Sequence, residues 1–296
     1  MDMEKVLLDT DIGGDIDDAV CLAYLLREPR CELMGITTVC GEPGIRASIA
    51  DAICKAAGKA IPIAAGLDST MSPARGYPTP GGAQALMHWK HDRYEKTDAP
   101  AFLYQKIREH PGEITLIGIG NMTNIATLLT RYQDAAGLLK GLCVMNGYFG
   151  EKPLPSPNHN WNTWVDPLAA QITFSSRVAN HRVIPLEVTE TLGLDAEQAR
   201  QMLAPNSALL RAVYAFGDNW LQEGQRLTLH DPLAAMAVFY PDLCCFERGN
   251  VSVVLDDQIN RGATSFLPQA GGCLEVARSV ERDRFYRLLR RTLCDQ

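Results

Sequence analysis

Aspartates crowd one short stretch near the start of the chain. Five of them, Asp9, Asp11, Asp15, Asp17 and Asp18, lie within ten residues. Carboxylates at this density repel one another, so the stretch needs a positive charge among them to be stable. A hard cation meets that need, because Ca²⁺ and Mg²⁺ are bound in proteins mainly by oxygen ligands. The spacing therefore predicts a metal-centred site.

Two other interpretations of the stretch use fewer of its residues. One is that Asp17 or Asp18 caps the helix expected to follow, since a carboxylate accepts hydrogen bonds from free N–H groups at a helix N-terminus. Capping leaves the other aspartates unexplained. The second is an EF-hand loop, which needs Glu at its twelfth position, where this chain has Val20. We therefore favour the metal site, with Gly13 and Gly14 giving the loop backbone freedom.

The elements around this stretch alternate between strand and helix. An apolar run at 6–8 predicts a strand that ends at the acidic stretch, and residues 19–26 predict the helix after it. Similar pairs recur along the chain, which is typical of a parallel sheet with right-handed crossovers. We expect an α/β fold with an open, mostly parallel sheet, helices on both faces and a small C-terminal strand group. Residues 1–296 are expected to form a single domain.

The other expected elements follow from apolar runs and turn signals. The expected strands are 32–39, 61–64, 114–119, 142–145, 183–188, 250–256, 264–266 and 273–277. The expected helices are 45–57, 101–110, the segment from 125, 196–203, 207–221, 230–240 and 282–293. Residues 147–160 are polar and rich in proline, which predicts a loop over the carboxyl edge of the sheet, where such folds bind ligands. No role is predicted for 66–100.

Asp-Pro occurs twice at the start of an expected helix. At Asp166 and Pro167 we predict a structural role, with the aspartate as N-cap and the proline in the first turn. The second pair, Asp231 and Pro232, taken alone predicts a cap in the same way. The residue before this pair is His230, which makes His-Asp the second chemical feature of the chain.

The acidic stretch resembles the N-terminal signature of the nucleoside hydrolases, the calcium-dependent, inosine- and uridine-preferring N-ribohydrolases. It has the form Asp-Thr-Asp-Ile-Gly-Gly-Asp-Ile-Asp-Asp-Ala at 9–19, and its Gly-Asp at 14–15 resembles the insertion of one family branch. Thr-Asn-Ile-Ala at 123–126 and His-Asp at 230–231 also match, in family order, and the resemblance covers nearly the whole chain. It implies a Rossmann-like nucleoside hydrolase fold and hydrolysis of purine or pyrimidine ribonucleosides to free base and ribose.

The resemblance also implies a role for each matching residue. One Ca²⁺ per subunit would be bound by Asp11, Asp18, Asp231 and the backbone carbonyl of Ile119. The ion would hold the ribose hydroxyls and a water molecule, whose proton passes to Asp11 as general base. His230, expected to titrate near neutrality, would protonate the departing base. The matching substrate-binding positions are Asp17, Asn162, Met145, Asn160 and Glu42.

Two of these positions depart from the commoner family pattern. Glu42 stands where the family usually has Asn, and Asn160 stands where it usually has Glu. Because both positions line the family's ribose pocket, we hypothesise that the changes compensate, so that the sugar still meets one carboxylate and one amide. The alternative is that Glu42 lies on the turn 41–44 and points to solvent. Substrate preference stays open, as do the roles of Asp15 and Cys40.

Two rival functions fit parts of the same sequence. Leu-Leu-Asp-Thr-Asp at 7–11 also fits a Mg²⁺-dependent phosphatase of the haloacid dehalogenase type, with Asp9 as the phosphorylated nucleophile. That alternative gives no role to the carboxylates at 17 and 18 or to the pair at 230 and 231. The other rival is a catalytically inactive protein that binds ribose compounds with calcium.

Composition favours a soluble protein with a small substrate. The formal net charge of −7 argues against nucleic acid as a partner. The nine cysteines form no Cys-x-x-Cys pair, so we expect reduced thiols rather than zinc or disulfides. The sequence shows neither a secretory signal nor a membrane-length apolar run, so we expect a cytoplasmic protein that does not bind a membrane. The resemblance implies a homo-oligomer, a dimer or tetramer, active in purine or pyrimidine salvage.

Overall fold

The centre of the molecule is a nine-stranded sheet, seen in a computed structural model that describes residues 3–73, 77, 79–150, 160–204, 206–222, 226–257 and 259–294. The strand order is β10-β9-β11-β6-β5-β4-β1-β2-β3. The strands are β1 (Glu4–Thr10), β2 (Cys31–Thr38), β3 (Ile63–Ala65), β4 (Ile114–Gly118), β5 (Gly141–Met145), β6 (His181–Ile184), β9 (Cys244–Val253), β10 (Thr264–Pro268) and β11 (Leu274–Val280). Of the nine strands of this sheet, β9 alone runs in the opposite direction to the others, so the predicted mostly parallel sheet is confirmed.

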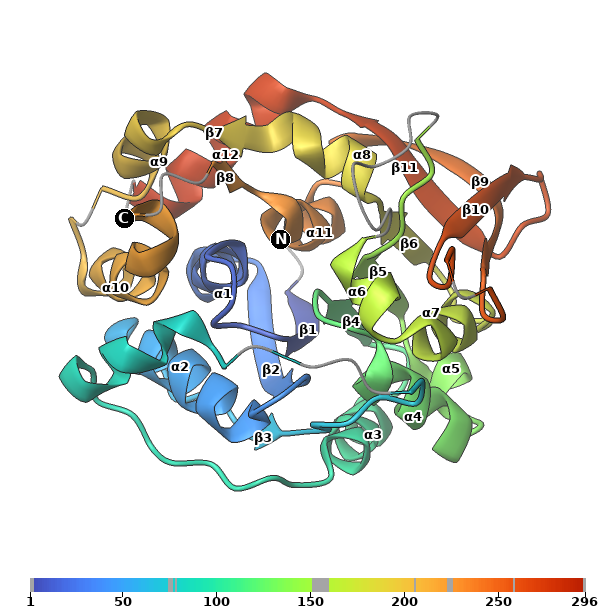
Figure 1. Ribbon diagram of the computed structural model, residues 1–296, viewed down its shortest axis with the longest axis horizontal. Helices are drawn as coiled ribbons and strands as arrows, with labels where there is room; N and C mark the ends of the chain where they lie inside the picture. The colour runs from blue at the N-terminus through green and yellow to red at the C-terminus, as the bar shows by residue number, and fades with distance from the viewer. Residues whose placement is uncertain are drawn as a thin grey trace.

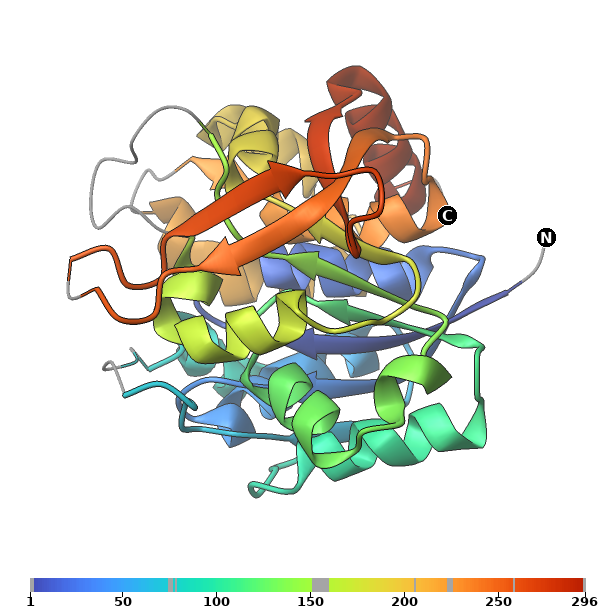
Figure 2. The same ribbon diagram turned by 90° about the vertical axis from the view of Figure 1, so that its right-hand side faces the viewer.

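Helices cover both faces of this sheet (Figures 1 and 2). On one face α1, α2, α10, α11 and α12 share a hydrophobic cluster that includes Leu22, Leu210 and Leu233. On the other face α3, α4 and α7 share a second cluster that includes Leu103 and Ile125. The helices are α1 (Asp17–Arg27), α2 (Pro43–Ala56), α3 (Ala99–Glu109), α4 (Thr123–Arg131), α5 (Ala135–Leu138), α6 (Trp161–Val165), α7 (Pro167–Phe174), α8 (Leu186–Thr189), α9 (Ala196–Met202), α10 (Ala208–Gln222), α11 (His230–Phe239) and α12 (Arg282–Cys294).

The order of the strands reverses between β1 and β4. From β1 the chain moves outward through β2 to β3, and it then returns to β4 and moves the other way through β5 to β6. Loops that leave neighbouring strands in opposite directions open a crevice at the carboxyl edge of the sheet, where such folds bind ligands. Asp11 follows β1, and Ile119 follows β4. The topology therefore brings these two predicted site residues to the same crevice.

The aspartates near helix N-termini are of two kinds, those that cap the helix and those that do not. Asp166 caps α7, accepting a hydrogen bond from the backbone N–H of Ala169 at 3.3 Å, which confirms its predicted structural role. By contrast, the N-cap residues of α1 and α11 are Ile16 and Leu229, and neither makes a side-chain cap. The capping interpretation of the aspartates at 17, 18 and 231 is therefore wrong, because these residues lie inside the first helical turn.

Several elements differ from the sequence-based expectation. The strand expected at 183–188 ends at Ile184, because Pro185 has no N–H to continue the ladder, and α8 begins directly after it. The segment 66–100 contains a 3₁₀ helix, η1 (Gly81–His88). A two-stranded sheet of β7 (Gly193–Leu194) and β8 (Leu227–Thr228) was not expected. Most of the loop expected at 147–160 lies outside the described residues.

Candidate active site

A cavity of about 380 Å³ opens at the crevice between the loops after β1 and β4. Its volume falls in the range of pockets that bind small molecules. Nine of the ten predicted site residues line it: Asp11, Asp17, Asp18, Ile119, Met145, Asn160, Asn162, His230 and Asp231. These residues come from the ends of three neighbouring strands and the starts of three helices, α1, α6 and α11. We call this space the site cavity.

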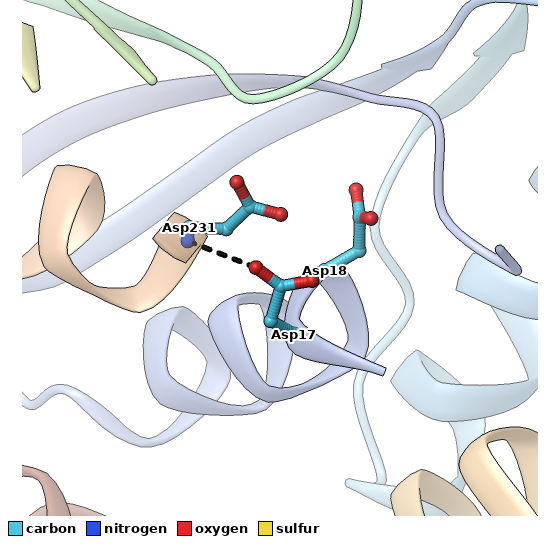
Figure 3. Close-up of side chains that lie close together, drawn as sticks. All are labelled: Asp17, Asp18 and Asp231. Atoms are coloured by element: carbon cyan, nitrogen blue, oxygen red, sulfur yellow. Dashed lines mark hydrogen bonds between the residues drawn. The ribbon is translucent and has the colours of Figure 1, made fainter. Parts of the chain in front are cut away.

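Three carboxylates meet inside the site cavity. One oxygen from each of Asp17, Asp18 and Asp231 lies within 4.8 Å of the others, and all three residues are buried (Figure 3). Asp17 Oδ2 accepts a hydrogen bond from the backbone N–H of Asp231 at 3.2 Å, which joins the start of α1 to the start of α11. The Thr10 hydroxyl donates to Asp18. No basic side chain forms an ion pair with these three carboxylates among the described residues.

Burial makes this group costly to ionise without a counter-ion. It raises the pKa of Asp17 to about 7, even though the Asp231 N–H favours the ionised form. Burial, and then the neighbouring aspartates, raise the pKa of Asp18 and of Asp231 well above the ordinary value. A divalent cation removes both the repulsion and the excess protons. The donor set, all carboxylate oxygens, fits a hard cation such as Ca²⁺ or Mg²⁺.

The compact carboxylate group differs in one member from the predicted ligand set. The resemblance implied Asp11 beside Asp18 and Asp231, whereas in the structure Asp17 completes the group. Asp11 and Ile119 line the same site cavity, outside the group. The carbonyl of Ile119, predicted as a ligand, accepts a hydrogen bond from Asn162 Nδ2 at 2.8 Å.

A buried arginine was missed by the sequence analysis. Arg46, in α2, lines the site cavity and is 3% exposed. It donates hydrogen bonds to the carbonyl oxygens of Ile12 (3.0 Å), Gly41 (2.9 Å) and Cys40 (3.2 Å), and also to that of Asp11. These contacts join the loop after β1 to the loop after β2. Burial raises the pKa of Asp11, and the charge of Arg46 opposes that rise.

The sequence does contain a weak signal for this arginine. A cation near the N-terminus of a helix is disfavoured by the helix dipole, and Arg46 follows Pro43, the first residue of α2, by three positions. An arginine at this position is expected to have a partner for its charge outside the helix. The carbonyl cluster and the nearby Asp11 are that partner.

Glu42 is the predicted site residue that the structure does not bring to the cavity. It precedes α2 as its N-cap, with a left-handed backbone at φ +56°, and its side chain is exposed. Asn160, its proposed counterpart, is buried and lines the site cavity. Asn160 accepts a hydrogen bond from the backbone N–H of Thr163 at 3.3 Å, capping α6. The geometry favours the alternative in which Glu42 is a solvated turn residue.

We expect Glu42→Asn to change kcat/KM by less than about two-fold, because surface substitutions are usually worth under ~0.5 kcal/mol and Asn tolerates a left-handed backbone. Asn160→Glu should lower kcat/KM about 10-fold or more, by placing a larger charged group where a buried amide caps a helix. The double variant should show the sum of the two effects. Recovery of activity in the double variant would instead establish that the two positions are coupled.

The imidazole of His230 is held on one side by a hydroxyl. Its Nδ1 lies 2.7 Å from the hydroxyl oxygen of Thr189. Burial lowers the pKa of His230 to about 4, although the nearby charge of Glu190 opposes this. The imidazole is therefore neutral in the ligand-free protein near neutral pH. The expectation that it titrates near neutrality was wrong, because burial disfavours the imidazolium ion.

Residues without a predicted role also line the site cavity, among them Asp15, Cys40 and Trp161. Asp15 brings a fifth carboxylate, and burial raises its pKa to about 8. Burial likewise raises the pKa of the Cys40 thiol to about 12, which makes it a poor nucleophile. Trp161 is half exposed, and its side chain opposes the rise in the pKa of Asp11, which favours the ionised form of that carboxylate.

Asp9 does not reach the site cavity. It is fully buried, and its Oδ1 accepts hydrogen bonds from Thr37 and from Asn124 Nδ2. A phosphatase nucleophile must be accessible to a phosphoryl group. The geometry therefore gives no support to the phosphatase alternative.

Sequence comparison places the chain in a family. Residues 6–287 match the family described as inosine-uridine preferring nucleoside hydrolase, which is nearly the whole chain. The chain therefore belongs to the inosine-uridine preferring nucleoside hydrolases. The conclusion agrees with the resemblance drawn from the acidic stretch and the His-Asp pair.

Individual relatives and solved structures support this assignment. Uridine nucleosidase 1 of Arabidopsis thaliana is 28% identical, over 84% of this chain and 78% of its own length. Non-specific ribonucleoside hydrolase RihC of Escherichia coli is 28% identical, over 93% of this chain and 91% of its own length. The plant nucleoside hydrolase PpNRh1 superposes with a TM-score of 0.82 at 25% identity, covering 99% of both chains. The purine-preferring ribonucleoside hydrolase of Gardnerella vaginalis, at 23% identity, shares the fold with a TM-score of 0.84 over 98% of both chains.

Proposed function

We propose that this protein hydrolyses the N-glycosidic bond of ribonucleosides, purine or pyrimidine, to free base and ribose, with one Ca²⁺ per subunit. Family membership supports the reaction class. The main observation in support of this site is that three buried carboxylates lie within 4.8 Å of one another. They lie in a cavity that His230 and Asn162 also line. A metal-binding acidic group beside an imidazole is suited to this reaction, because hydrolysis needs an activated water and a protonated leaving group.

The cation would be held by the four predicted ligands, which are Asp11, Asp18, Asp231 and the carbonyl of Ile119. Asp17 lies close to this set. All of these residues line the site cavity. When bound, Ca²⁺ supplies positive charge that orients the ribose hydroxyls and a water molecule.

Asp11 is the proposed general base. Its carboxylate lines the site cavity, and both Arg46 and Trp161 favour its ionised form against the effect of burial. An ionised carboxylate accepts the proton that water loses as it attacks the anomeric carbon.

Asn162 is fixed in one orientation. Its Nδ2 donates to the carbonyl oxygens of Ile119 at 2.8 Å and of Met145 at 3.0 Å. Both amide hydrogens are therefore used within the protein, and Oδ1 is the atom left to accept a hydrogen bond from a ribose hydroxyl. Asp17 offers the same kind of acceptor from the start of α1.

His230 is the proposed general acid. Because the imidazole is neutral in the ligand-free protein, it must take up a proton from solvent before it can donate one to the leaving base. Negative charge that develops on the leaving nitrogen stabilises the imidazolium ion. Proton transfer to the base then returns the imidazole to its neutral form.

The experiment that tests this function is a chromatographic screen of the purified protein against a nucleoside panel, with calcium and with a chelator. We expect free base and ribose in the calcium arm and loss of both in the chelated arm. Phosphomonoesters without nucleosides form a second arm, in which released phosphate would support the phosphatase alternative. A third arm measures ribose-compound binding by calorimetry, and tight binding without product would support the inactive binding protein.

We further propose a cytoplasmic, homo-oligomeric protein that releases free bases for salvage. Its nine cysteines are free thiols, as a reducing compartment would keep them. No helix in the described part of the chain is both long and apolar enough to cross a membrane. The dimer or tetramer implied by the resemblance is tested by light scattering of the purified protein.

A further inference from the structure

Thr189 makes two hydrogen-bond contacts with its single hydroxyl group. It ends α8, is fully buried, and does not line the site cavity. The hydroxyl donates to the carbonyl oxygen of Leu186 at 3.0 Å, and the same oxygen lies 2.7 Å from His230 Nδ1. Leu186 lines the site cavity, so this short helix joins the imidazole to the cavity wall.

The chemistry of these atoms fixes where the imidazole proton lies. A hydroxyl has one proton to donate, and a carbonyl oxygen can only accept. When both contacts are made together, the Thr189 proton goes to Leu186 and the hydroxyl oxygen accepts from His230. The Nδ1 atom of His230 must then carry a proton. Because Thr189 occupies the Nδ1 side, Nε2 is the ring nitrogen left to face the cavity.

We propose that Thr189 is a positioning residue, whose hydroxyl holds His230 with the proton on Nδ1 so that Nε2 alone exchanges protons with the leaving base. The inference rests on the proposed function of His230 as general acid. In the neutral imidazole Nε2 has a lone pair. It takes up a proton from solvent to form imidazolium and gives that proton to the leaving nitrogen, while the other ring proton stays on Nδ1, hydrogen-bonded to the Thr189 oxygen.

The hydroxyl can be tested separately from the packing of the side chain. Thr189→Val has the same shape without the hydroxyl, and Thr189→Ser keeps the hydroxyl without the methyl group. If the residue only packs, the valine variant is the milder of the two. If the hydroxyl positions His230, the serine variant is the milder one.

The first measurement does not depend on activity. Histidine-selective nitrogen-15 labelling, with the His230 signals identified from a His230→Ala variant, reports which ring nitrogen carries the proton in the neutral imidazole. We expect a proton on Nδ1 in the wild type and in Thr189→Ser, and a mixture of tautomers in Thr189→Val. A wild-type imidazole with its proton on Nε2, or an unchanged tautomer in Thr189→Val, would overturn the proposal whatever the substrate.

The second measurement compares two leaving groups. Thr189→Val should lower kcat on a nucleoside by about 10-fold or more, part of the 10²–10⁴-fold that general acid help supplies. Its kcat on a nitrophenyl riboside should stay within about two-fold of the wild-type value, since nitrophenolate departs without a proton. In the His230→Ala background the same substitution should have no further effect. Equal losses on both substrates would overturn positioning, whereas a wild type inactive on every riboside would refute the proposed function and leave the tautomer result standing.

Discussion

Asp11→Asn should lose turnover on every riboside, including one with a nitrophenolate leaving group. The substitution keeps the shape of the side chain but removes the acceptor of the water proton, a step that every substrate shares. Loss of a general base typically costs about 10²–10⁴-fold in rate. Since Asp11 is also a proposed ligand, its loss should weaken the metal site as well. Initial rates at saturating calcium, measured for a nucleoside and a nitrophenyl riboside, test this expectation.

His230→Ala should instead lower the rate on one substrate and not on the other. A nucleoside needs protonation of its leaving nitrogen and should lose about 10²–10⁴-fold, whereas nitrophenyl riboside should retain activity close to that of the wild type. A matched control is Asp68→Asn, which changes an exposed aspartate paired with Lys96 on the surface, away from the site cavity. It should leave both substrates unaffected.

The two variants together separate the roles of base and acid. If His230→Ala loses the same factor on both substrates, His230 is not the acid. If Asp11→Asn retains nucleoside turnover at saturating calcium, Asp11 is not the base, and the proton of the attacking water must go elsewhere. Asp17 is then the next residue to substitute, since its carboxylate also lines the site cavity.

The site residues that could be predicted from the sequence are those whose positions follow from the topology of the sheet. A parallel sheet places the carboxyl ends of its strands at one edge, so residues after β1, β4 and β5 meet there whatever the details of packing. Asp11, Ile119 and Met145 follow or end these strands, and all three line the site cavity. The same logic places the carboxylates at the start of α1, because that helix follows β1 directly.

Contacts between side chains of distant elements could not be predicted in this way. The place of Arg46 near the N-terminus of α2 indicates a partner for its charge but does not identify that partner, the backbone carbonyls of the loop after β1. Thr189 reaches His230 only because β6 stops at Pro185 and the chain turns into α8. Glu42 departs from its predicted role for a similar reason, since the left-handed backbone at this residue decides where its side chain points.

Removing calcium should make stability depend on pH in an unusual direction. Carboxyl groups whose pKa is raised by burial hold protons in the folded protein that they release in the unfolded chain. Asp17 has a pKa of about 7 in the metal-free fold against 3.8 as its ordinary value. Between these two values the folded state binds more protons, so stability should fall as pH rises. The fall should continue to about pH 8, where Asp15 also ionises.

Calcium should reverse this trend, because it binds the ionised carboxylates. We expect thermal unfolding with a chelator to show a lower Tm at about pH 8 than at about pH 5. Calcium at 100 times its Kd should then raise the Tm at the higher pH by about 4 °C, since the binding contributes about 2.7 kcal/mol. At the lower pH the rise should be smaller, because protons compete with calcium for the same oxygens.

Asp231→Asn supplies the matched variant for this prediction. It removes one charge from the group of three, so the chelated variant should lose less stability than the wild type as pH rises. It should also lose most of the response to calcium, because the buried group then has one ligand fewer. A wild type whose chelated form is as stable at about pH 8 as at about pH 5, with no response to calcium at either pH, would mean that the carboxylates at 17, 18 and 231 are stable without a cation. The metal-centred interpretation of the site cavity would then be wrong, although the fold and the family would stand.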